Sequence, residues 1–230
     1  MLVQTSHSGN VGAAARAMKV MGFSDLILVA PRFPDVLVQE ETVAMASGAA
    51  DILVRARIVP TLEDALDGVT YACATAMTPR DFGPCTFAPR GLLPTLAGSG
   101  HRLAFVFGSE RYGLGNEDVY RCHACLSIPT APGYGSLNLA QAVQLIAYDW
   151  RQALGSFDVV PRTPARHRAG AEAVQGTLQH WERALTAIGF LDPAAPKKLM
   201  PRLNQLFNRA ELSPEEVHIL RGIAKAMLDK

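Results

Sequence analysis

The 230-residue chain is predicted to be an α/β protein with a mostly parallel sheet and helices on both faces, followed by a small all-helical unit. Three observations predict this class. Short apolar runs alternate with amphipathic segments over the first 150 residues, as in chains built from βα units. These runs are mostly apolar, as expected of parallel strands buried on both faces. Toward the C-terminus, only helical periodicity remains.

Five apolar runs are predicted to form strands, with helices between them. The strand candidates are residues 25–30 (DLILVA), 55–59 (RARIV), 70–75 (TYACAT), 103–107 (LAFVF) and 124–128 (ACLSI). The helix candidates are residues 11–21, 39–48, 62–67, 116–121 and 136–154. We therefore expect a first domain over residues 1–154.

Residues 155–170 (GSFDVVPRTPARHRAG) are predicted to be a linker, because they mix Pro, Gly and cations without periodicity. Residues 171–230 are expected to form a helical extension with helices at 171–188, 196–208 and 213–228. The last of these has a clear start, with Ser213 as N-cap and Pro214 at the first helical position.

Composition narrows the expected cellular location and the kind of partner. No run of 18 apolar residues and no signal-peptide pattern occurs, so a cytoplasmic protein without a membrane partner is expected. Residues 1–150 hold 10 Lys/Arg against 13 Asp/Glu, whereas residues 151–230 hold 12 against 8. A basic tail on a slightly acidic body is a weak indication of a polyanionic partner.

An early Gly-bearing turn, SHSGNVGAAAR, allows three interpretations. A dinucleotide-binding loop needs G-x-G-x-x-G, and an acid at the end of the next strand. Gly9 and Gly12 fit the last two glycines, but His7 stands at the first position and the next strand does not end in an acid. The second interpretation is an ordinary capped helix with Asn10 as N-cap. The third is that Asn10 and Arg16 take part in chemistry.

Two later motifs favour the third interpretation, since each also lies at a strand end. Together the three are Asn10-x-Gly12-x-x-x-Arg16, Gly108-x-Glu110-x-x-Gly113-Leu114, and Ile128-Pro129 with Ser136-Leu137-Asn138-Leu139. In this order they resemble the motifs of SpoU-type RNA 2′-O-methyltransferases in the SPOUT superfamily. The tail, from HWERALTAIGF at residue 180 to residue 223, is similar to the C-terminal extension of the bacterial J-type tRNA methyltransferases.

The resemblance implies a fold, a reaction and partners. The first domain would contain a C-terminal trefoil knot and bind S-adenosyl-L-methionine, which leaves as S-adenosyl-L-homocysteine, with no metal. The protein would be a homodimer that methylates the ribose of a cytidine or uridine at position 32 of the tRNA anticodon loop, and the tail would face the tRNA. DNA and membranes are not expected as partners.

The resemblance also assigns residues. The catalytic positions would be Arg16, Asn10, Glu110, Ser136 and Asn138. The cofactor would contact Thr75, Ala76, Met77, Gly108, Ile128, Gly135, Ser136 and Leu137. Two departures are expected to matter locally: the first strand, at residues 1–4, is several residues shorter than in relatives, and Met77-Thr78 replace a small residue and a cation.

Other functions remain open at this point. The same domain could modify another tRNA position or ribosomal RNA, or it could be a non-catalytic RNA-binding protein that kept the fold. Cys122-x-x-Cys125 has metal-like spacing, but no second cysteine pair lies at zinc-site distance, so we expect no metal. Trp150 and Trp181 are expected to pack helices rather than stack bases.

Overall fold

The computed structural model describes residues 1–76, 78, 80–160, 162–163 and 167–229. The chain divides into two compact units, Met1–Asp158 and Val159–Lys230, each of which is described by itself. None of the helices in the described residues is both long and apolar enough to cross a membrane.

The first unit is built on a parallel sheet. One ladder has the order β1-β2-β3 and the other the order β5-β7-β4-β6, and every pairing is parallel. The ladders meet where the Val3 amide donates to the Phe107 carbonyl (2.8 Å) and the Phe107 amide donates to the Met1 carbonyl (3.0 Å). The strands are β1 Leu2–Val3, β2 Ile27–Val29, β3 Arg57–Val59, β4 Tyr71–Thr75, β5 Thr86–Phe87, β6 Leu103–Val106 and β7 Ala124–Leu126.

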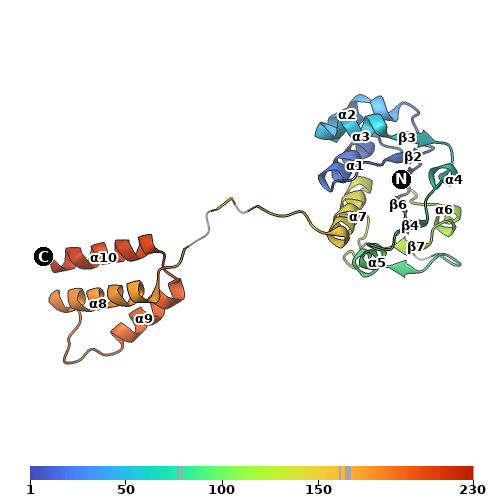
Figure 1. The fold of residues 1–230 in the computed structure, drawn as a ribbon. Helices are drawn as coiled ribbons and strands as arrows, with labels where there is room; N and C mark the ends of the chain where they lie inside the picture. The colour runs from blue at the N-terminus through green and yellow to red at the C-terminus, as the bar shows by residue number, and fades with distance from the viewer. Residues whose placement is uncertain (77, 79, 161, 164–166, 230) are drawn as a thin grey trace. The chain divides into compact units, whose positions relative to one another are not determined.

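Helices cover both faces of this sheet (Figure 1). Leu28 and Cys73 belong to a core shared with α1, α3, α5 and α7, whereas their neighbours Val29 and Ala74 pack with α4 and α6. This alternation explains why the strands are apolar on successive residues. The helices are α1 Ser8–Val20, α2 Glu40–Ala46, α3 Ala50–Arg55, α4 Leu62–Ala65, α5 Pro89–Leu96, α6 Asn116–Tyr120 and α7 Leu139–Leu154, with 3₁₀ turns η1 Val36–Val38 and η2 Ser47–Ala49.

The predicted parallel α/β class is confirmed, and each of the five strand candidates contains a strand. Three elements were not predicted: β5, α3 and α5. Helix α5 contains Gly91 and Pro94, which weaken a helical pattern. Helix α3 follows α2 after a break at Ser47, whose φ of 50° is left-handed.

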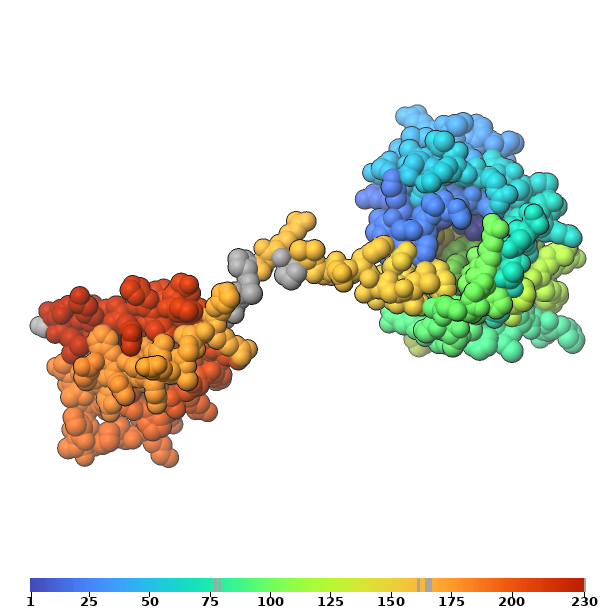
Figure 2. Space-filling view, viewed as in Figure 1, coloured from blue at the N-terminus to red at the C-terminus, as the bar shows by residue number. Residues whose placement is uncertain are grey.

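Helices α1 and α2 pack with their backbones in contact, and Figure 2 shows this region in blue. A Cβ built on Gly12 would lie 2.0 Å from the Thr42 carbonyl oxygen and 2.9 Å from the Ala46 nitrogen. The fully buried Thr42 hydroxyl donates to the Ser8 carbonyl (3.0 Å). Glycine at position 12 is therefore required for this close approach.

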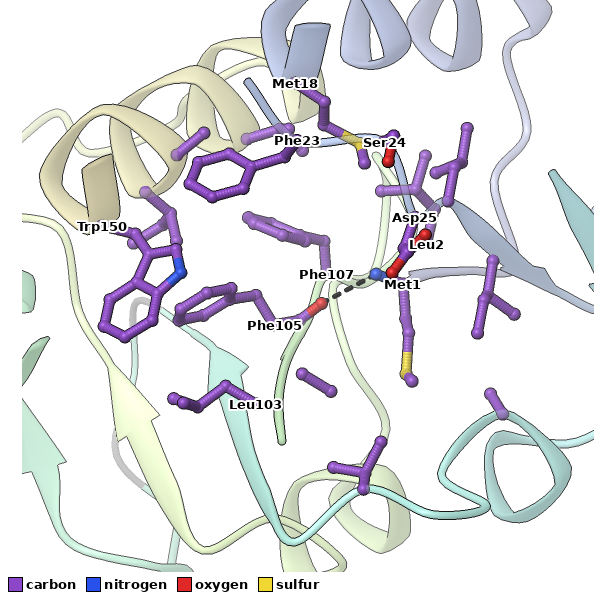
Figure 3. A pocket seen from close by; sticks show the side chains of 18 of the residues that line it. Met1, Leu2, Met18, Phe23, Ser24, Asp25, Leu103, Phe105, Phe107 and Trp150 are labelled. Atoms are coloured by element: carbon purple, nitrogen blue, oxygen red, sulfur yellow. Dashed lines mark hydrogen bonds between the residues drawn. The ribbon is translucent and has the colours of Figure 1, made fainter. Parts of the chain in front are cut away.

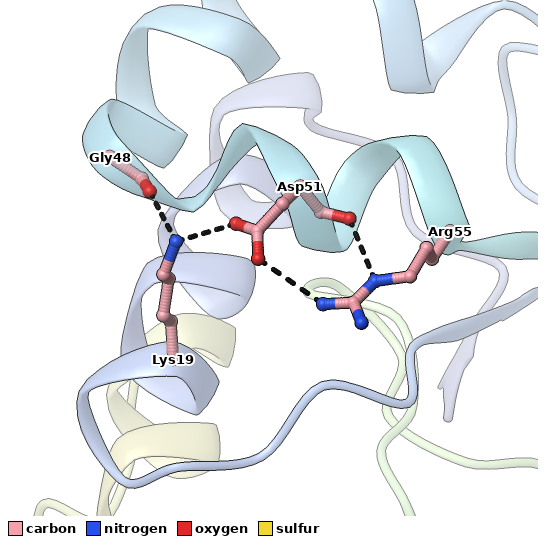
Figure 4. Close-up of polar contacts among 4 residues, drawn as sticks. All are labelled: Lys19, Gly48, Asp51 and Arg55. Carbon is pink, nitrogen blue, oxygen red and sulfur yellow. Dashed lines mark hydrogen bonds and ion pairs between the residues drawn. The ribbon is translucent and has the colours of Figure 1, made fainter.

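A polar cluster joins the last turn of α1 to α3 (Figure 4). The Lys19 ammonium donates to the Asp51 carboxylate (2.6 Å) and to the Gly48 carbonyl (2.7 Å), and Arg55 pairs with the same carboxylate at 3.2 Å. The Lys19 hydrogen bond is the largest influence that holds the pKa of Asp51 below its ordinary value. Since these groups are about half exposed, we expect a small contribution to stability.

The described part of the second unit consists of helices α8 Ala171–Ala187, α9 Leu199–Ala210 and α10 Pro214–Leu228. Val174, Leu178, Phe207 and Val217 form its core, and the Trp181 indole packs on this core while donating to the Leu220 carbonyl (2.9 Å). The predicted start of the last helix is confirmed, because Ser213 and Glu216 form a capping box.

Gly12→Ala should lower the free energy of unfolding by about 1–3 kcal/mol or more, because the new methyl group must push α1 away from α2. Gly91→Ala in α5 is the matched control: nothing lies within 4 Å of its added Cβ, so the helix should gain up to about 1 kcal/mol. Urea unfolding monitored by circular dichroism measures both values. Equal effects at the two positions would contradict the packing account.

Candidate active site at the carboxyl edge of the sheet

The predicted site residues gather at the carboxyl edge of the sheet, where ligands of parallel α/β proteins usually bind. Strands β7, β4 and β6 are neighbours, so the loops that follow them leave from the same edge. A pocket of about 310 Å³ lies there, and we call it the carboxyl-edge pocket. Among the residues predicted to contact a cofactor, those that line it are Thr75, Ala76, Gly108, Ile128, Gly135, Ser136 and Leu137. Met77 lies outside the described residues.

The loop after β6 closes tightly on itself beside the pocket. Ser109 and Gly113 exchange backbone hydrogen bonds of 3.1 and 2.9 Å. A Cβ on Gly108 would lie 2.0 Å from the Gly113 carbonyl carbon, so no larger residue fits at position 108. Gly113 itself has a φ of 68°, which favours glycine. These glycines bring backbone amide and carbonyl groups to the pocket wall.

The Glu110 network links this loop to the first turn of α1. The Glu110 carboxylate accepts from the Ser6 amide (2.9 Å), the Ser6 hydroxyl (2.8 Å), the His7 amide (3.4 Å) and the Asn10 side-chain amide (2.9 Å). The side-chain oxygen of Asn10 in turn accepts from the side-chain amide of Asn138 (2.9 Å). Since a carboxylate offers about four acceptor positions, Glu110 is saturated and suits an anchoring role better than a proton-transfer role.

The protonation of Glu110 follows from this geometry. Burial raises the pKa of Glu110, but hydrogen bonds from Asn10 and Ser6 favour the ionised form, and the net pKa lies below its ordinary value. The carboxylate is therefore charged at neutral pH and attracts the positive end of α1.

Asn138 extends the network to α7. Its side-chain oxygen accepts from the Ala140 backbone amide (2.9 Å). Its backbone amide donates to the Gln141 side-chain oxygen (3.2 Å), which completes a capping box. The helix predicted over residues 136–154 therefore begins at Leu139, with Asn138 as its N-cap. The alternative of Asn10 as N-cap is wrong: α1 begins at Ser8 after His7, and Asn10 lies inside the first turn, where its side chain binds Glu110 instead.

Two predicted catalytic residues lie outside the network. Arg16 is exposed on α1, and none of the hydrogen bonds or ion pairs in the described residues involves its guanidinium. Ser136 is exposed and lines the carboxyl-edge pocket. The structure thus joins Asn10, Glu110 and Asn138 through hydrogen bonds, and it leaves Arg16 available to an external anion.

Sequence reasoning missed a second carboxylate at the start of α1. Glu41 of α2 accepts a short hydrogen bond from the Ser8 hydroxyl and lies against Gly9, whose added Cβ would be 2.8 Å from a Glu41 oxygen. Glu110 and Glu41 therefore both hold the amino end of α1. The signal available was weak, because Glu41 is one of two adjacent acids that open a predicted helix.

Arg80 was also missed. It lines the carboxyl-edge pocket, and its buried Nε has no hydrogen-bond partner among the described residues. The guanidinium could pair with a carboxylate or phosphate that enters the pocket. A cation just after a strand end was the available signal.

The cysteines do not resemble a metal centre. The described residues contain no cluster of three or more His, Cys, Asp or Glu side chains that could hold a metal ion. Burial raises the pKa of the Cys73 and Cys122 thiols to about 12.

A larger cavity of about 630 Å³ lies at the opposite, amino edge of the sheet (Figure 3). Its wall includes Phe105, Phe107 and Trp150, and the Met1 amino group donates to the Phe105 carbonyl (2.8 Å). Trp150 packs edge-on against Phe105, as expected of a helix-packing residue. We place the site in the smaller pocket, because none of the predicted site residues lines the larger one.

Glu110→Gln should remove a pH-dependent part of the stability. Because the folded-state pKa is depressed, this contribution is complete above the unfolded pKa of about 4.5 and is lost as pH falls through the lower folded value. The Tm difference between wild type and variant should therefore be largest near pH 7 and narrow below about pH 4. Glu63→Gln, which removes an exposed carboxylate from α4, serves as the control. A Tm difference that stays constant between pH 7 and 3 would contradict the assignment.

Two protein-family models match this chain, one over each of its two units. The SpoU rRNA Methylase family model matches residues 1–148, and the model of the tRNA methyltransferase TrmJ C-terminal domain matches residues 172–230. The tRNA (cytidine/uridine/adenosine-2′-O-)-methyltransferase TrmJ of Pseudomonas aeruginosa is 43% identical, over 97% of this chain and 90% of its own length. The Klebsiella pneumoniae tRNA (cytidine/uridine-2′-O-)-methyltransferase TrmJ is 39% identical, over 97% and 93%.

Solved structures give the same result. The crystal structure of TrmJ from Z. mobilis has a TM-score of 0.84 at 30% identity and covers 99% of this chain and 97% of its own. A probable methyltransferase from Bordetella pertussis has a TM-score of 0.62 at 49% identity, over 66% of this chain and 93% of its own. With its glycine-lined pocket, its Glu110 network and these matches along both units, the chain belongs to the SpoU methylase family and carries the C-terminal domain of the TrmJ methyltransferases.

Proposed function

We propose that this protein transfers the methyl group of S-adenosyl-L-methionine to a ribose 2′-hydroxyl in tRNA, at the cytidine or uridine of anticodon-loop position 32. The observation that carries the proposal is the convergence of the carboxyl-edge pocket with the first turn of α1, in a chain whose relatives named as tRNA 2′-O-methyltransferases match it over nearly its full length.

The carboxyl-edge pocket is the proposed cofactor site. Backbone at Gly108 and Gly135 lines this pocket, and the apolar Ile128 and Leu137 border the same space. The residue types fit S-adenosyl-L-methionine, whose sulfonium supplies an already activated methyl group. We further propose that the loops after β4, β6 and β7 form the trefoil knot of the SPOUT superfamily.

Arg16 is the proposed contact with the RNA. A ribose hydroxyl is a weak nucleophile, so catalysis depends on holding it in line with the methyl group and on favouring its deprotonation. The Arg16 guanidinium is exposed and is unpaired among the described contacts. It suits binding of the neighbouring phosphate and orientation of the hydroxyl.

A homodimer would complete the site. Leu139, Val143, Ile146 and Ala147 of α7 are buried in the first unit. Leu145 and Tyr148, however, lie one turn apart and are 40% and 43% exposed. An apolar stripe of this kind fits the same helix of a second copy, which would place Arg16 of one protomer near the carboxyl-edge pocket of its partner.

Incubation with S-adenosyl-L-methionine and unmodified tRNA, followed by nucleoside mass spectrometry of the anticodon-loop fragment, tests the activity and its position. Methylation of ribosomal RNA alone would overturn the tRNA assignment, and absence of transfer with intact RNA binding would favour a non-catalytic RNA-binding protein.

Arg16→Ala should abolish transfer while calorimetry still detects cofactor binding, because Arg16 is assigned to the RNA.

Mixing two inactive variants tests the shared site. Arg16→Ala is combined with Asn138→Ser, which removes the amide but keeps an N-cap residue for α7. Random exchange gives about half heterodimers, each with one intact composite site, so about a quarter of wild-type activity should return. No recovery after verified subunit exchange would contradict the shared site.

The second unit is the proposed tRNA-facing extension. Lys198, Arg202 and Arg209 fall within about 40° around α9 and span about 16 Å, and we call them the basic face of α9. Residues 193–210 contain no acid, and no ion pair in the described residues involves this face. Lys198 stands at the amino end of the helix, where a cation is unfavourable, so stability does not explain it.

Arg202→Gln/Arg209→Gln should weaken tRNA binding and reduce the slope of log K against log[salt] by about 0.7–0.9 per removed phosphate contact. Arg183→Gln/Lys225→Gln removes the same charge from α8 and α10 and is the matched control. Filter binding at several salt concentrations measures both slopes. Equal losses in the two double variants would show a diffuse charge effect rather than a binding face.

A further inference from the structure

Each of the three loops at the carboxyl edge exposes one aromatic ring. Phe82 lies in the loop after β4 and is 100% exposed. Tyr112, in the loop after β6, and Tyr134, in the loop after β7, are each 77% exposed. Since β7, β4 and β6 are adjacent and parallel, the three loops start next to one another at this edge. We call the three side chains the aromatic rim.

The aromatic rim does not contribute visibly to folding. Among the described hydrogen bonds, none involves the hydroxyl of Tyr112 or Tyr134, and the three rings are absent from the hydrophobic cores. Phe82 has a φ of 62°, a conformation that a bulky residue rarely adopts. Large apolar rings held in water at a site edge indicate a binding surface.

Cations lie among these rings. Arg80 and Arg111 come from the same loops as Phe82 and Tyr112, and both line the carboxyl-edge pocket together with Tyr112. The Arg111 guanidinium lies 5.2 Å from the centre of the Tyr112 ring. Exposed rings interleaved with cations match the chemistry of an unpaired RNA segment, whose bases stack on aromatics and whose phosphates pair with arginine.

We propose that the aromatic rim is a base-stacking surface that holds unpaired loop nucleotides of the RNA on either side of the acceptor ribose. This inference rests on the proposed RNA substrate and adds how the acceptor is presented. Stacking requires a ring but not a hydroxyl, and it is tolerant of base identity. The rim would thus select an open loop over a duplex, in which stacked bases are inaccessible.

The test uses the full-length protein with Phe82→Leu, Tyr112→Leu and Tyr134→Leu, each paired with the ring-retaining Phe82→Tyr, Tyr112→Phe or Tyr134→Phe. Each leucine variant should raise KM for tRNA by roughly 5- to 150-fold with little change in kcat, and the ring-retaining variants should resemble wild type. Cofactor binding, measured by calorimetry, should be unchanged in Phe82→Leu and Tyr134→Leu, because neither ring lines the carboxyl-edge pocket. Phe157→Leu, at an exposed ring that packs on Arg151 away from these loops, is the control.

A second readout does not depend on methyl transfer. An anticodon stem-loop RNA with 2-aminopurine beside the acceptor position should lose fluorescence on binding wild-type protein, because the base stacks, and keep it with Tyr112→Leu. Normal KM values in all three leucine variants together with unchanged fluorescence would overturn the proposal. Loss of cofactor binding in Phe82→Leu or Tyr134→Leu would also overturn it, because the rings would then support the pocket. A change in oligomeric state would overturn it as well, because the rings would then cover a second copy. Absence of methylation despite ring-dependent quenching would overturn the proposed reaction but not the stacking surface.

Discussion

The Glu110 carboxylate accepts hydrogen bonds from the segment that leads into α1, and the rest of the site is arranged around it. Without these bonds, the Ser6 amide and the Asn10 side chain would be partly buried and unsatisfied, which is costly. With them, the loop after β6, the start of α1 and the cap of α7 are joined through Asn10 and Asn138. One half-buried charge thus connects three segments that the sheet alone would not hold in register.

The same helix is also held from its other side, where it packs on α2. Gly12 lets the α1 backbone touch α2, and Glu41 and Thr42 bind Ser8 at the helix start. A helix fixed in this way can project Arg16 into solvent with little freedom to move as a whole. This arrangement suits the proposed role of Arg16, in which the guanidinium would meet an RNA phosphate at a defined distance from the pocket.

Rigid and exposed parts of the site have different origins. The pocket wall is formed by backbone close to strand ends, where Gly108 leaves no room for a side chain. The outer rim consists of long or aromatic side chains on loops, with Phe82 and Tyr134 most exposed to solvent. Loops positioned by a rigid scaffold commonly carry recognition, so an invariant small cofactor and a large RNA can be served by adjacent but distinct surfaces.

The sequence by itself determined the βα alternation, the parallel sheet, the cap at Ser213 and the family, because these depend on neighbouring residues or on short motifs. Helix α5 escaped prediction since Gly91 and Pro94 oppose a helix that tertiary packing of Leu92, Leu93 and Leu96 stabilises. Sequence left Asn10 open between a helix cap and a part in the chemistry, whereas the structure gives its side chain to Glu110. Only tertiary structure could decide that contact, because Asn10 lies 100 residues from Glu110 and 128 from Asn138, and no local pattern encodes which distant partners the folded sheet brings together.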